Sequence, residues 1–199
     1  MSRMKVIALA MVVIALLASA FYWLDFLVAH SETRFASRLS TVSNRAPQSA
    51  QSAPALGRVN LRVEGRGELP AALVAELRKG LSAGAYFGAV EVEEGAPQPL
   101  DNVIVVKVGG QSYQWSGIYS RAHVEAVALL STNGDVPLDG ERVVRFTGDK
   151  QTVVVRGEYD MDDTSWGLLS RKGYTADLGR RFADQIGKSL AAELARHSS

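Results

Sequence analysis

The sequence predicts an α+β fold: one mixed, mostly antiparallel sheet with two helices packed on one face, preceded by a single N-terminal transmembrane helix. Three observations support this prediction. A long apolar run lies near the N-terminus, a strand-helix-strand-strand order begins near residue 57, and further strands with short turns lead to a closing amphipathic helix. Strands and helices segregated in this way typically form a sheet with the helices on one side.

The apolar run at residues 6–28 contains a single charged residue, Asp25. At 1.5 Å per residue, a helix of this length crosses a hydrocarbon core of ~30 Å. Arg3 and Lys5 precede the run, so the positive-inside rule places the N-terminus in the cytoplasm. We therefore expect residues 1–30 to be a transmembrane anchor or signal segment. A retained single-pass anchor in the inner membrane, with the C-terminal domain in the periplasm, is the favoured interpretation.

A cleaved signal peptide is the alternative. Ala18, Ser19 and Ala20 fit the small-x-small cleavage pattern, and residues 6–17 would be the apolar region of the signal. The residues after Ala20 are still strongly apolar, which is an unusual start for a mature protein. Both interpretations imply that the rest of the chain is exported. The sequence alone does not decide whether the chain is cleaved after Ala20.

Residues 31–56 are rich in Ser, Ala, Pro and Gln. This composition buries too little apolar surface to offset the entropy of ordering the chain, so it predicts a flexible linker. The first part of this linker could continue the membrane helix. Residues 57–199 then form the exported α+β domain, which is long enough for one hydrophobic core.

Apolar residues in alternating or continuous runs predict the strands of this domain. They are expected at residues 58–64, 88–94, 102–108, 122–131, 141–147 and 151–159. Gly109 and Gly110 are expected to turn the chain, and residues 112–120 to form an edge strand or a mobile hairpin. Residues 166–169 are expected to lie in the core, and the alternative is that they form a second exposed apolar segment.

Two helices complete the domain. The first begins near Pro70, which suits a first helical turn, and ends at Gly84. The second covers residues 175–196 and is amphipathic, with a charged face that includes Arg181. Gly179, Ala183 and Gly187 are expected to let its backbone approach the sheet closely, and the alternative is a helix-helix dimer face. Its apolar stripe consists of Leu178, Phe182, Ile186, Leu190 and Leu194.

The composition excludes several classes of function. The chain has 22 Lys+Arg and 21 Asp+Glu, a net charge of +1, whereas a nucleic-acid-binding protein normally presents a basic surface. It has no cysteine, which excludes a disulfide, a thiolate nucleophile and a cysteine-ligated metal. It also lacks a phosphate-binding loop and the short motifs of serine hydrolases and zinc proteases. We therefore expect no cofactor, no metal and no catalytic residues.

The acidic residues at 158–163 are expected to form a solvated loop. The loop lacks the glycine and the glutamate that a calcium-binding loop needs at its sixth and twelfth positions. His123 is expected to be a structural or surface histidine. An alternative hypothesis is a hydrolase that combines His123 with these acids.

The candidate partner-binding residues are Tyr113, Trp115, Ile118 and Tyr119, in the otherwise polar stretch QSYQWSGIYSR. Tyr and Trp offer a large contact area at a low cost in conformational entropy, so they are typical of binding surfaces. The alternative is that Trp115 packs into the core under its own loop.

Several segments of residues 57–197 resemble a broad group of small bacterial envelope modules. They are GRVNLRVEG, LPAALVAELRKGL, VEVEE, LDNVIVVKV, HVEAVALLSTNGD and LGRRFADQIGKSLAAEL. The group includes N-terminal domains of the TolB type, LptE-like proteins and ABC-transport auxiliary lipoproteins. The resemblance implies a non-catalytic adaptor in envelope assembly or transport. Many members carry a lipid on a cysteine, and here an uncleaved N-terminal helix would replace it.

Together these observations predict a non-enzymatic, membrane-tethered periplasmic adaptor that binds another cell-envelope or membrane protein, or lipid. It would contact the inner membrane through residues 6–28 and would not bind nucleic acid. A second hypothesis is an accessory subunit of a membrane complex that is bound through its transmembrane helix. Asp25 would favour that hypothesis, because a carboxylate within a membrane is costly unless it is paired. The alternative is that Asp25, at the end of the helix, reaches the interfacial water.

Overall fold

A computed structural model describes residues 3–23, 27–43, 56–83, 87–92, 102–132 and 153–198. It contains the helices α1 (Arg3–Trp23), α2 (Glu68–Ala83) and α3 (Arg171–Ser198). Its strands are β1 (Leu27–Ser43), β2 (Leu56–Glu64), β3 (Phe87–Val92), β4 (Asn102–Trp115), β5 (Tyr119–Ser131) and β6 (Val153–Leu169). The predicted strand at residues 141–147 lies outside the described residues.

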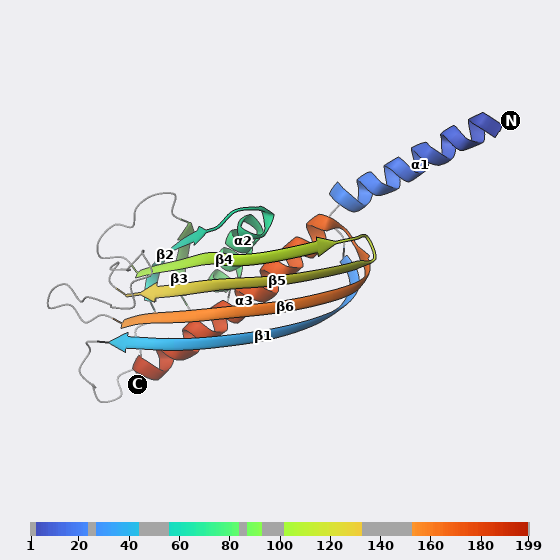
Figure 1. Cartoon of the computed structure of the whole chain (residues 1–199). Coiled ribbons are helices and arrows are strands. Elements are labelled where there is room, and N and C mark those ends of the chain that lie inside the picture. The colour runs from blue at the N-terminus through green and yellow to red at the C-terminus, as the bar shows by residue number, and fades with distance from the viewer. Residues whose placement is uncertain are drawn as a thin grey trace.

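The described strands form one mixed sheet of six, in the order β1-β6-β5-β4-β2-β3 (Figure 1). β2 is parallel to β3 and to β4, whereas β4, β5, β6 and β1 are joined by antiparallel pairing. α2 connects β2 to the parallel strand β3. The predicted α+β class and mixed sheet are thus confirmed.

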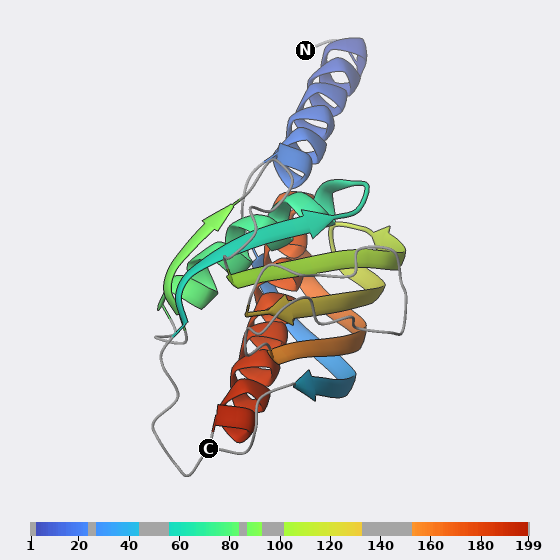
Figure 2. The ribbon, with the colours of Figure 1, turned by 90° about the vertical axis from the view of Figure 1, so that its left-hand side faces the viewer.

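The helices α2 and α3 lie on the same side of the sheet, and no described helix covers the other face, which we call the open face (Figure 2). The core between them contains the apolar stripe predicted for α3, including the fully buried Ile186. Gly179 faces α2 rather than the sheet, because an added Cβ would lie 3.2 Å from the Ala72 carbonyl carbon. The small residues of α3 therefore serve helix-helix packing, and the expectation of close helix-sheet contact at these glycines was wrong.

The β4–β5 hairpin corrects another detail. Gly109 and Gly110 do not turn the chain, because β4 continues through them to Trp115. The register shifts between Val108 and Gly110, which marks a bulge, and a Cβ at Gly110 would lie 2.8 Å from a carboxylate oxygen of Glu125. Glycine accommodates the extra residue of a bulge because it has no side chain. The tight turn of the hairpin is at residues 116–118.

The largest correction concerns the predicted linker at residues 31–56. Its first part is not flexible, because β1 pairs with β6 along its whole length, from Leu27 opposite Leu169 to Ser43 opposite Val153. Leu56 already belongs to β2, and residues 44–55 lie outside the described residues. Half of the partly buried side chains of β1 are Ser or Thr, so its pattern lacks the apolar alternation that marks a strand.

The N-terminus also differs from the prediction. α1 ends at Trp23, and Leu27 and Val28 belong to β1 rather than to a helix over residues 6–28. Among the described residues, no helix has the length and apolar character needed to cross a membrane. α1 extends away from the domain at the end of the sheet where β4 turns into β5 (Figure 1).

A buried polar network joins β1, β6 and α3. The carboxylate of Asp163 on β6 is fully buried and lies 2.6 Å from a guanidinium nitrogen of Arg181 on α3. Thr33 on β1 donates a hydrogen bond of 2.7 Å to one oxygen of this carboxylate and accepts one from Arg181. Ser165 and Tyr174 each donate to the other oxygen over 2.8 Å. Each oxygen of the carboxylate thus has two donors.

The same network contradicts two expectations. Asp163 belongs to a strand rather than to a solvated acidic loop, as do its acidic neighbours on β6. Arg181 does not lie on a charged solvent face, because it is only 20% exposed and forms a second ion pair of 2.8 Å with Asp177. The buried acid on β6 and the basic residue on α3 each fall within a polar stretch, so sequence periodicity could not pair them.

Replacing Asp163 by Asn should destabilise the domain by about 3 kcal/mol, because removing one partner of a buried ion pair leaves the other charge uncompensated. Asp177 keeps the loss from being larger. The matched control is Asp162→Asn, the next residue, whose carboxylate is 55% exposed on the opposite face. The control should change stability by less than about 1 kcal/mol. Urea denaturation midpoints measure both, and equal midpoints would contradict the network.

Candidate functional site

An exposed apolar patch lies at the end of the sheet where α1 joins the domain. It combines the start of β1, the β4–β5 turn and the end of β6. Each of its side chains is between 41% and 71% exposed. We call it the apical patch, and its residues are Val28, Ile118, Tyr119, Trp166 and Leu168.

Cross-strand pairing brings the residues of the apical patch together. Val28 lies opposite Leu168, and Trp166 lies between His30 and Tyr119. The rings of Tyr119 and Trp166 are 6.1 Å apart, centroid to centroid. Residues from distant parts of the sequence therefore form one continuous surface.

Gly167 allows these strands to meet so closely. Its φ of +139° is a conformation that favours glycine, and a Cβ there would lie 2.3 Å from the carbonyl oxygen of Val28. Its N–H donates a hydrogen bond of 3.0 Å to the carbonyl of Ile118 in the β4–β5 turn. Gly167 thus ties the turn to β6, while its lack of a side chain leaves room for β1.

The structure divides the four predicted binding residues into two pairs. Ile118 and Tyr119 are exposed and belong to the apical patch. Tyr113, which is 37% exposed, and the partly buried Trp115 point to the opposite, helix-covered face. Tyr113 stacks on Tyr174 at 5.7 Å, and Trp115 donates a hydrogen bond of 3.1 Å to the carbonyl of Leu169 while packing against the core. The alternative interpretation of Trp115 as a packing residue is confirmed.

Sequence reasoning did not include three members of the apical patch among the binding residues. Val28 was assigned to the membrane segment, and Trp166 and Leu168 were assigned to the core, with exposure as the alternative. Only Leu169 of residues 166–169 is fully buried. The burial of β6 alternates, so that Asp163, Ser165 and Leu169 face inward while Trp166 and Leu168 face outward, but the sequence does not show this alternation because two of the inward residues are polar.

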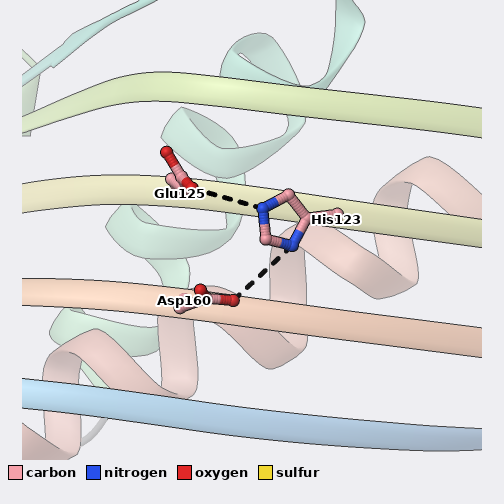
Figure 3. A group of neighbouring side chains, drawn as sticks. All are labelled: His123, Glu125 and Asp160. Carbon is pink, nitrogen blue, oxygen red and sulfur yellow. Dashed lines mark hydrogen bonds and ion pairs between the residues drawn. The ribbon is translucent and has the colours of Figure 1, made fainter.

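A second cluster lies in the middle of the open face of the sheet (Figure 3). His123 Nε2 is 3.3 Å from a carboxylate oxygen of Glu125, and Nδ1 is 3.1 Å from Asp162 and 3.6 Å from Asp160. The structure therefore does bring His123 to the acidic residues of β6. It does so across neighbouring strands, where His123 is paired with Asp162 in the register.

The carboxylates around His123 decide its charge. Partial burial lowers its pKa, but the hydrogen bonds to Glu125 and Asp162 and the charges of Asp160 and Asp162 outweigh this effect. The pKa of His123 is therefore raised above its ordinary value of 6.5. The imidazolium form is the one that both sides of the ring favour, because each nitrogen then donates to a carboxylate.

This geometry limits what the cluster can do chemically. His123, Glu125 and Asp160 each offer one ligand atom, and these three atoms lie within 4.8 Å of one another. A cation bound by them would lie on the exposed face of the sheet rather than in a buried site. A hollow of about 570 Å³ beside them is lined by Glu125, Asp160 and Lys107 but not by His123. A general base that activates a hydroxyl needs a free nitrogen directed at it, whereas both nitrogens here face carboxylates.

No protein-family model matches the sequence, and no curated protein matches it. Among solved structures, the chain is similar to the PelC dodecamer from Paraburkholderia phytofirmans. A single-substitution variant shows 14% identity and a TM-score of 0.41 over 78% of this chain and 98% of that chain. A second crystal form shows 13% identity and a TM-score of 0.38 over 79% and 98%. A minor lipoprotein from Acinetobacter baumannii shows 8% identity and a TM-score of 0.29 over 70% and 92%. Likeness at these scores carries no argument about function.

The raised pKa of His123 predicts a pH-dependent contribution to stability. Because the folded-state pKa lies above the unfolded value, the contribution is complete below the ordinary pKa of 6.5 and is lost as the pH rises through the folded value. Wild type should therefore lose stability relative to His123→Gln between mildly acidic and mildly alkaline pH. The effect should be small, because the side chain is 35% exposed. Parallel urea titrations across this pH range measure it, and a constant difference between the two proteins would rule it out.

Proposed function

We propose that this chain is a non-enzymatic adaptor of the bacterial envelope, held at the inner membrane by the apolar N-terminal run at residues 6–28, of which α1 is a part, with its α+β domain in the periplasm. It acts by binding another envelope component, protein or lipid. The observation that carries this proposal is the arrangement at one end of the sheet, where an apolar helix and an exposed apolar surface lie next to each other.

The exposed side chains of α1 support a membrane environment. From residue 4 to residue 19 every side chain is exposed, although nearly all are apolar. A folded protein rarely leaves so large an apolar surface in water, so such a surface indicates contact with a membrane or a partner. Arg3 and Lys5 before this surface support export of the residues that follow it.

The short connection between α1 and β1 supports a domain that is held close to the membrane. Only residues 24–26 separate the end of α1 from the start of β1, and β1 is an integral strand. The domain would therefore stay at the membrane surface rather than extend from it on a long linker.

The surface of the domain supports binding rather than catalysis. The apical patch offers aromatic and aliphatic side chains of the kind that concentrate binding energy. The His123 cluster lends no support to the hydrolase alternative, because its imidazole is held between carboxylates. The alternative of an accessory subunit bound through its helix rests on Asp25, which lies outside the described residues.

Cell fractionation of the full chain with a C-terminal tag tests this proposal. We expect an uncleaved protein in the membrane fraction that resists carbonate extraction and whose tag is digested by protease added to spheroplasts. Exchanging residues 3–23 for an unrelated membrane anchor should preserve partner co-purification if the domain binds, and abolish it if the helix does. An N-terminal sequence that begins at Phe21 would refute the anchor, and a protected tag would refute export.

A further inference from the structure

We infer that the apical patch is a membrane-docking surface, which places the end of the sheet in the headgroup region of the bilayer that holds α1. This inference rests on the proposed membrane association of α1. It names the occupant of the patch, lipid rather than protein, and it gives the domain a fixed orientation.

The chemistry of the patch fits a lipid interface. Trp166 and Tyr119 each have an apolar ring with one polar group, and such side chains concentrate where hydrocarbon meets water. Ile118 and Leu168 are the aliphatic side chains beside them, and both are more than half exposed.

The pattern along the strands places a boundary on the patch. Its first row is Val28 and Leu168, and its second row contains His30, Trp166 and Tyr119. The next row toward the middle of the sheet is polar throughout, with Glu32, Thr164 and Arg121. Two residues of strand separate successive rows, a distance of ~7 Å. The apolar depth thus matches the ~5–10 Å to which surface-bound segments enter a bilayer.

The covalent connection to α1 selects the membrane as the occupant. Four Cα–Cα steps join Trp23 to Leu27, so these residues are at most ~14 Å apart. Val28, the next residue, is itself part of the patch. If α1 lies in a bilayer, the patch is held at its surface at high effective concentration, and even a weak affinity for lipid is sufficient for docking.

The absence of cysteine from the chain allows a direct test by single labelling sites. Ile118→Cys and Leu168→Cys each place an environment-sensitive fluorophore in the patch of the full-length protein. Ser40→Cys is the matched control, because Ser40 is an exposed outward residue near the far end of β1. Val13→Cys reports on α1. The labelled proteins are reconstituted into vesicles of phosphatidylethanolamine and phosphatidylglycerol, with or without a lipid that carries a doxyl quencher near its headgroup.

We expect the labels at Ile118 and Leu168 to be quenched by the doxyl lipid and to lose access to a water-soluble quencher, whereas the label at Ser40 remains accessible to water. If they stay as accessible as Ser40 while the Val13 label is in lipid, docking is refuted and the anchor stands. If the Val13 label is also in water, both proposals fail. Protection at Ile118 and Leu168 that disappears when the protein is diluted with excess lipid would identify a second copy as the occupant and refute docking.

Discussion

The buried ion pair between Asp163 and Arg181 connects the first strand, β1, to β6 and α3, because Thr33 of β1 forms hydrogen bonds to both residues. Removing two charges from water is costly, and the cost is offset only when hydrogen bonds satisfy the remaining lone pairs and protons. Here Thr33 from β1 provides one of those bonds, and Ser165 and Tyr174 provide others. Burial and the charge of Asp163 raise the pKa of the Tyr174 phenol, which keeps it protonated as a donor. β1 is therefore held by polar groups on its inward face, supplemented by partly buried Leu27 and Leu39.

This arrangement has a consequence for function. Because only three residues separate the end of α1 from the start of β1, ordering β1 within the sheet brings the domain to the end of the apolar helix. The apical patch lies at that same end, whereas the charged cluster around His123 lies farther along the open face. A domain that docks through the patch would place this end of the sheet at the membrane. The opposite end of the sheet, where α3 has its C-terminus, would then point away from the membrane (Figure 1).

The sequence predicted those elements whose apolar pattern reports burial directly. β2, β4 and α3 are such elements. The mixed sheet to which β2 and β4 belong was therefore also predicted. β1 escaped prediction because its inward residues include Ser31, Thr33 and Thr41, which are satisfied by Ser165, Asp163 and Glu193 from distant parts of the chain. For the same reason Arg181 resembled a surface residue. Two of the five residues of the apical patch were predicted, because Ile118 and Tyr119 are adjacent in sequence, whereas Val28, Trp166 and Leu168 meet them only through strand pairing.

Hydrogen exchange of the intact chain, followed by mass spectrometry of peptides from residues 27–43, tests the central claim most directly. β1 lies at the edge of the sheet that the described strands form, so roughly half of its amides should be bonded to β6 and exchange slowly, like those of β5, while the others have no partner among these strands. Exchange of all amides of this segment at the rate of an unstructured peptide would show that β1 is a linker. In that case the buried network and the close tether would both be wrong.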